Sequence, residues 1–186
     1  MIHLGLYEIS EITIGVIFWW VGVYFLSRKP YTALSWLVFG LLTGFGFLMF
    51  TDPIYTNTRT IEEYIKWQKI LDWPLFFAPI FYFHVSFLLR AKPNKFQKYL
   101  LIVGYLGATI FYIFDIISNS IINTKIIRVS DLKYNYIFAP GILLWPAVIF
   151  ETGFVALAIN NFSLEIKKNF PKYFLVILGG IFYILS

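Results

Sequence analysis

The stretch DWPLFFAPIFYFHVSFLLR, residues 72–90, decides the fold of this chain. Tyr and Trp apart, the only polar side chains between its two charged ends are those of His84 and Ser86. At about 1.5 Å per helical residue, residues 73–89 cross most of a hydrocarbon layer about 30 Å thick. The stretch therefore predicts a membrane span, with Trp73 at one interface and the basic run that begins at Arg90 at the other.

The whole chain has the composition of a membrane protein. Of its 186 residues, 59% are hydrophobic and 13% are charged, against about 45–50% and about 25% in soluble domains. No Gly/Ser linker or repeat divides the chain, so we expect residues 1–186 to form one all-α, polytopic transmembrane helix bundle. The lipid bilayer is then the main partner. We interpret the net charge of +5 as a topology signal and expect no nucleic-acid partner.

The apolar runs place the individual spans. They predict five complete spans, at about 9–27, 32–50, 73–89, 99–117 and 137–159, and a sixth at 173–186. The sixth run has about 14 residues where about 20 are needed to cross a bilayer. We therefore expect five complete spans plus a truncated sixth, in a protein that continues beyond Ser186.

The basic residues predict the orientation. Alternate loops carry nine Lys or Arg residues with one acidic residue on one side, and six with seven acidic residues on the other. The side with more Lys and Arg in short loops faces the cytoplasm in most membrane proteins. We therefore predict a multi-pass protein of the cell membrane whose N-terminus lies outside.

Two longer loops then face outward. In the first, Thr60 and Glu63 have the spacing of a capping box, which predicts the start of a short amphipathic helix that leads into the third span. This helix is either an ordinary interfacial helix or a lid over a ligand. The second loop, residues 119–136, mixes Ile with polar residues, and its pattern does not decide between a helix and a hairpin.

Three ionisable side chains are candidate ligand-binding or switch residues, because such groups are costly inside a bilayer. His84 and Glu151 lie at similar predicted depths, so we expect a hydrogen bond between the third and fifth spans that responds to protonation. The alternative is that each bonds a backbone carbonyl or water and only stabilises the bundle. Asp115 lies close to a polar segment, which favours a structural role with its carboxylate in contact with interfacial water.

Prolines and small residues predict how the helices bend and pack. Pro74, Pro79, Pro140 and Pro146 each lack a backbone donor, so the outer halves of the third and fifth spans are expected to bend. The second span contains a G-x-x-x-G motif, Gly40 and Gly44 with Gly46 close by, which favours close helix packing.

Bent helices leave space for a ligand. We expect three aromatic side chains to line an outer cavity for a small apolar or amphipathic ligand: Tyr82, Trp145 and Phe150.

The chain contains no motif of a soluble enzyme. No Walker A, dinucleotide-binding, zinc-protease or nucleophile-elbow motif occurs, and the two histidines lack metal-ligand spacing. Cysteine is absent, which excludes disulfides and thiolate metal sites. We therefore predict that this piece has no catalytic residues, is not an enzyme, and binds neither a metal nor another cofactor.

The order of these parts resembles a known family. A basic turn at residues 27–30, an outer helix with Trp67 and Gln68, and a Pro-rich aromatic third span closed by Arg90 resemble the N-terminal seven-helix sensor region that precedes bacterial histidine kinases. The resemblance implies a signal-input domain without its output domains. It also implies an unknown small ligand and a homodimer formed through the missing C-terminal part.

Two other classes of function fit the same sequence. One is a small-solute transporter or membrane enzyme subunit that uses His84 and Glu151 as a proton relay, although no inverted repeat is visible in the chain. The other is a purely structural protein of membrane assembly.

The predicted orientation can be tested by cysteine labelling, because the chain has no cysteine of its own. In intact cells, Thr56→Cys should react with an impermeant thiol reagent and Asn94→Cys should not, since the positive-inside rule places only Thr56 outside. Labelling confined to Asn94→Cys would contradict the orientation.

Overall fold

The computed structural model describes residues 5–55, 57–58, 60–90, 95–118, 120–126 and 136–166, and the predicted sixth span at 173–186 lies outside them. The described elements, in chain order, are α1 (Leu6–Arg28), α2 (Ala33–Tyr55), α3 (Ile61–Leu71), α4 (Trp73–Leu89), α5 (Lys95–Ser118), β1 (Ile122–Ile126), β2 (Tyr136–Pro140) and α6 (Leu144–Ile166). Five helical segments are long and apolar enough to cross a membrane, with α3 and α4 forming one of them. This is the architecture of a multi-pass membrane protein, and α4 has the predicted bounds of the third span.

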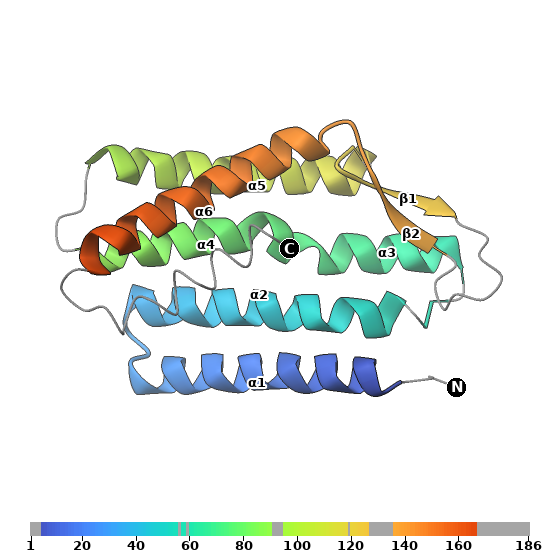
Figure 1. Ribbon diagram of the computed structural model, residues 1–186, viewed down its shortest axis with the longest axis horizontal. Helices are drawn as coiled ribbons and strands as arrows, with labels where there is room; N and C mark the ends of the chain where they lie inside the picture. Colours follow the sequence, from blue (N-terminus) through green and yellow to red (C-terminus); the bar gives the residue numbers. More distant parts are fainter. Residues whose placement is uncertain are drawn as a thin grey trace.

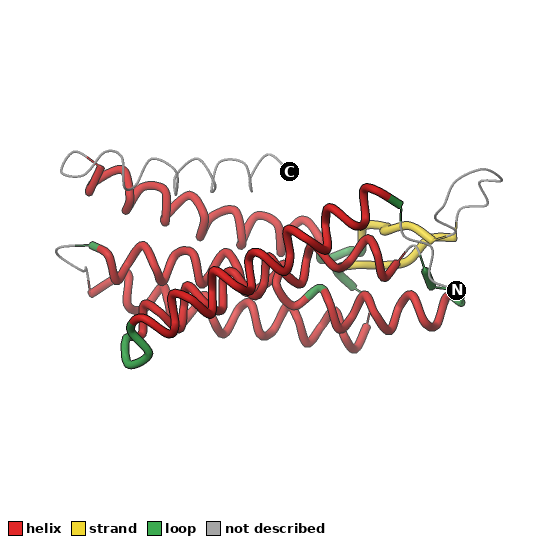
Figure 2. Tube along the Cα trace, turned by 90° about the horizontal axis from the view of Figure 1, so that it is seen from below, coloured by secondary structure: helices red, strands yellow, loops and turns green. Residues whose placement is uncertain are grey.

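The helices run along one common direction, which gives the bundle two ends (Figure 1). The start of α1, the start of α3 and the β1–β2 pair lie at one end, here called the hairpin end. The α1–α2 turn, the end of α4 and the end of α6 lie at the other, here called the turn end. Figure 2 shows the same two ends from a perpendicular direction. Under the predicted topology, the hairpin end faces out.

Helix α4 lies at the centre of the bundle. It packs against α2, α5 and α6 and follows directly on α3. Within α4 only Leu88 is exposed, whereas Ile80 and Phe83 have no accessible surface. Aromatic contacts fill the core around it, for example between Phe83 and Phe154, whose ring centroids lie 5.4 Å apart.

Helices α1 and α5 expose apolar faces, as helices in contact with lipid do. The exposed apolar side chains of these two helices include Ile14, Val16, Ile17, Trp20, Val23, Phe25, Ile102, Val103, Leu106, Ile110, Ile113 and Ile117.

The glycines of α2 allow close packing against two neighbouring helices, α4 and α1. Gly40 and Gly44 face α4, as close packing at a G-x-x-x-G motif requires. Gly46 instead faces α1, where an added Cβ would lie 2.6 Å from Nε1 of Trp19. Gly15 of α1 meets the Gly46 carbonyl from the other side. Gly46 therefore permits close packing of α1, whereas Gly40 and Gly44 permit close packing of α4.

Most of the expected proline bends do not occur. Pro74 occupies the first turn of α4, where a missing N–H costs nothing. Pro146 stands in the first turn of α6 for the same reason, and Pro140 is the last residue of β2. Of these four prolines, only Pro79 lies beyond the first turn of a helix. The two spans therefore begin close to Pro74 and Pro146 instead of bending at them.

The second long loop contains a hairpin, so the fold is not purely α-helical. Strands β1 and β2 pair antiparallel, with Ile122 opposite Pro140. Residues 137–140 belong to this sheet, and the fifth span begins at Leu144 instead of residue 137. Gly141 makes the change of direction possible, because an added Cβ there would lie 2.1 Å from the Ser120 carbonyl oxygen.

Candidate functional site

The α3–α4 segment carries polar side chains to both ends of the bundle. Thr60 caps α3 by accepting a hydrogen bond of 3.1 Å from the Glu63 amide, which confirms the predicted helix start. Only Asp72 separates α3 from α4, and its backbone is itself in the right-handed helical region. The Asp72 amide donates to the Gln68 carbonyl at 2.9 Å, as within a continuous helix. The two helices therefore follow each other without a loop.

At the hairpin end, Asp72 is the centre of a buried polar network. Its side chain is 5% exposed. The Tyr55 hydroxyl, from the end of α2, donates to Oδ1 of Asp72 at 3.2 Å. The buried Gln68 side chain also hydrogen-bonds this carboxylate. These contacts attach the end of α2 to the junction of α3 and α4.

Helix α5 joins the same network through its last turns. The Tyr112 hydroxyl donates to the Lys69 carbonyl at 3.1 Å, and Nζ of Lys69 donates to the Ile116 carbonyl at 2.6 Å. Asp115 interacts electrostatically with both Lys69 and Asp72. The hairpin-end network thus consists of Tyr55, Gln68, Lys69, Asp72, Tyr112 and Asp115.

Asp115 also positions the β-hairpin. Its Oδ1 accepts a hydrogen bond of 2.8 Å from the Ile122 amide, the first amide of β1. The side chain is 2% exposed. The expectation that this carboxylate reaches interfacial water was therefore wrong, because the hairpin folds back over the end of α5 and supplies a backbone donor in place of water.

At the turn end, a second buried network centres on Asn161 of α6, which is 1% exposed. Its Oδ1 accepts from Nε2 of Gln97 at 2.7 Å and from Nη1 of Arg90 at 3.3 Å. Its Nδ2 donates to the Ser86 hydroxyl at 3.0 Å. Oε1 of Gln97 is buried and has no hydrogen-bond partner among the described residues. This turn-end network joins α4, α5 and α6.

The expected hydrogen bond between His84 and Glu151 is not found. Nδ1 of His84 lies 2.9 Å from the Tyr105 hydroxyl, so this histidine is paired with α5 instead of α6. Glu151 is half-buried, and no described residue hydrogen-bonds its side chain. Similar depth in the sequence does not place two side chains on facing sides of their helices, which explains the error.

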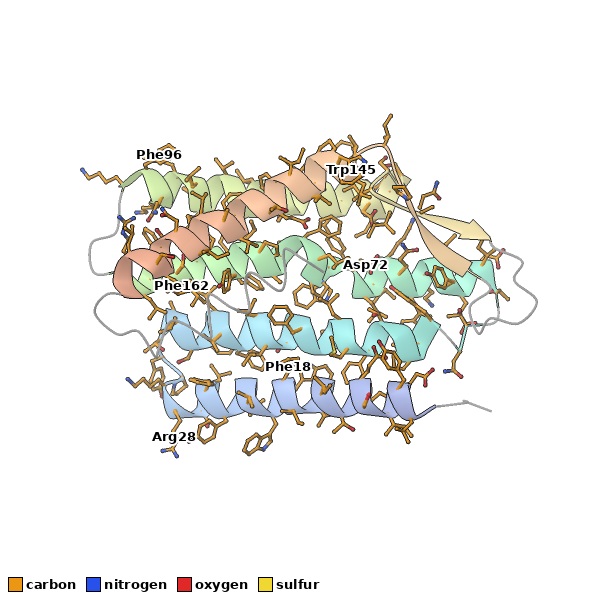
Figure 3. The ribbon with its side chains drawn as sticks, viewed as in Figure 1. Phe18, Arg28, Asp72, Phe96, Trp145 and Phe162 are labelled. Carbon is orange, nitrogen blue, oxygen red and sulfur yellow. The ribbon has the colours of Figure 1, made fainter. Side chains whose placement is uncertain are left out.

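The three aromatic residues expected to line one cavity lie apart. Trp145 is 68% exposed at the start of α6. Tyr82 is buried and packs on Phe162, with ring centroids 5.4 Å apart. Figure 3 shows Trp145 and Phe162 toward opposite ends of the bundle. Phe150 lies between α6 and α5, and its ring centroid is 5.4 Å from that of Phe111.

Sequence reasoning missed the turn-end network. Ser86 had been noted as polar, but Asn161 and Gln97 had not been singled out. The available signal was their position, since an amide close to the end of an apolar run joins helices in many membrane proteins. Which amides meet depends on the helix rotations, and single-sequence patterns do not give these.

The described residues contain no group of three or more His, Cys, Asp or Glu side chains that could hold a metal ion. Comparison of the chain with protein-family models, curated proteins and solved structures finds no match. The polar groups of the two networks make hydrogen bonds and charge interactions between helices.

The contribution of the turn-end network to stability can be measured by substituting two adjacent residues, Asn160 and Asn161, of which only Asn161 is buried. Asn161→Leu leaves the buried Gln97 amide and Ser86 hydroxyl, and the partly buried Arg90, without this partner, which should cost about 1–3 kcal/mol. Asn160→Leu makes the same chemical change on the exposed side and should alter thermal stability in detergent far less. Equal losses of stability in the two variants would refute this role for Asn161.

Proposed function

We propose that this chain is the membrane-embedded signal-input domain of a bacterial signal-transduction protein, such as a histidine kinase. The observation that supports the proposal most directly is that α3–α4 contributes to both polar networks. Gln68, Lys69 and Asp72 belong to the hairpin-end network, whereas Ser86 and Arg90 belong to the turn-end network. A change at one end then alters contacts along the same helical segment at the other.

The hairpin-end network has properties suited to receiving a stimulus. Asp72 and Asp115 are both buried and repel each other. Lys69 offsets this repulsion by its attraction to Asp115. A ligand, ion or proton that altered this balance would favour a different arrangement of α2, α3 and α5, provided that it bound the two arrangements with different affinity. The input ligand is proposed to be a small molecule acting at this end.

The other parts of the proposal come from the resemblance to the seven-helix sensor region. It implies that output domains follow the membrane part and that the protein forms homodimers through its C-terminal part. The described polar contacts favour this proposal over the proton relay, because His84 bonds Tyr105 and not Glu151.

The coupling between the two ends can be tested with a spin label at Leu164→Cys, an exposed position in the last turns of α6. Asp72→Asn replaces the buried carboxyl group of the hairpin-end network and should change the mobility of the label at the turn end. Glu62→Gln removes an exposed carboxylate from the first turn of α3 and should leave the label unchanged. Tyr55→Phe, which removes only the hydroxyl that binds Asp72, should shift the spectrum in the same direction as Asp72→Asn.

Asn161→Leu serves as the positive control, because it breaks the network next to the label. A label that responds to Asn161→Leu but not to Asp72→Asn or Tyr55→Phe would contradict the proposed coupling. Transport of a solute by the purified protein in proteoliposomes would favour the transporter instead.

A further inference from the structure

Helix α1 carries a ladder of flat side chains that ends in a cation. The rings of Trp20 and Tyr24 are stacked, with centroids 6.0 Å apart and an interplanar angle of 18°. The guanidinium carbon of Arg28 lies 5.1 Å from the centroid of the Tyr24 ring, and Nη2 of Arg28 donates to the Tyr24 hydroxyl at 3.0 Å. Trp20 is 69% exposed and Tyr24 45% exposed. The ladder therefore lies on a lipid-accessible side of α1, and Tyr24 holds the cation in place.

This end of α1 has no acidic neighbour in the sequence. No Asp or Glu occurs between Glu11 and Asp52, and the exposed Lys29 follows Arg28 directly. Within the described part of the chain, no carboxylate forms a salt bridge or hydrogen bond with Arg28. Figure 3 shows the Arg28 side chain at the turn end of α1, directed away from α2. Among the described residues, no carboxylate neutralises this charge, which leaves Arg28 accessible to water or to an anion from outside the protein.

The α1–α2 turn places these cations at the membrane surface. The indole N–H of Trp36, at the start of α2, donates to the Pro30 carbonyl at 2.9 Å. Trp36 is 57% exposed and Tyr31 98% exposed. Exposed Trp and Tyr side chains at the end of a span lie at the level of the lipid headgroups. We therefore expect Arg28 and Lys29 to lie at the depth of the lipid phosphates.

We propose that Trp20, Tyr24, Arg28 and Lys29 form a binding site for one anionic phospholipid. The anionic lipid phosphate accepts hydrogen bonds from the Arg28 guanidinium and the Lys29 ammonium, and an acyl chain lies along the rings of Tyr24 and Trp20. A planar guanidinium fixed over a ring is better prepared for phosphate than a mobile lysine, because less side-chain freedom is lost on binding. The site is separate from both polar networks and does not depend on the proposed signalling role.

The site can be tested by titrating the full chain in detergent with phosphatidylglycerol or phosphatidylcholine and measuring the first bound lipid by native mass spectrometry. The unchanged chain should bind phosphatidylglycerol more tightly. Arg28→Gln should weaken phosphatidylglycerol binding about fivefold, the change that about 1 kcal/mol per basic residue gives. Tyr24→Phe, which keeps the ring but releases the guanidinium from the hydroxyl, should weaken it less.

Lys66→Gln is the matched control, because it lowers the net charge equally at an exposed position of α3, at the hairpin end. It should leave phosphatidylglycerol binding unchanged. Equal weakening by Arg28→Gln and Lys66→Gln would show that only net charge matters and would overturn the site. Equal binding of the two lipids by the unchanged chain would overturn it as well.

Discussion

Helix α4 has one exposed side chain, that of Leu88, and this enclosure constrains the rest of the bundle. Because α2, α5 and α6 surround it, every polar group on α4 needs a partner from the protein. Ser86 finds Asn161, and His84 finds Tyr105. The glycines of α2 that face α4 let the backbones approach closely. Polar contacts near both ends and aromatic packing between them thus fix α4 in position.

Local patterns in the sequence predicted the parts of this arrangement that depend on neighbouring residues. The bounds of α4 follow from a continuous apolar run between two charges, and the start of α3 follows from the spacing of Thr60 and Glu63. Each depends on contacts within one helix. The start of α6 was misplaced because Pro140 was read as part of a span, whereas Pro140 and Gly141 mark the end of a strand and a turn.

Contacts between helices were harder to predict, since they depend on how each helix is rotated. Depth along the bundle could be estimated for His84 and Glu151 at 1.5 Å per residue. The direction in which each side chain points could not be estimated. His84 is hydrogen-bonded to Tyr105, a contact that the sequence did not indicate. Asn161 was missed for the same reason, although it contacts two other helices. Its hydrogen bonds go to residues that are distant in the sequence, and local sequence patterns do not indicate such contacts.

The enclosure of α4 can be measured directly, because the cysteine-free chain accepts single spin labels without background. Oxygen dissolves in the hydrocarbon layer, so its collision rate with a label reports contact with lipid. In bilayers, a label at Leu75 on one side of α4 and labels at Phe77 and Phe81, which share the opposite side, should all show low oxygen accessibility. Labels at Ile17 of α1 and Leu106 of α5 should show high accessibility. An α4 label as accessible to oxygen as those at Ile17 and Leu106 would contradict the central position of this helix.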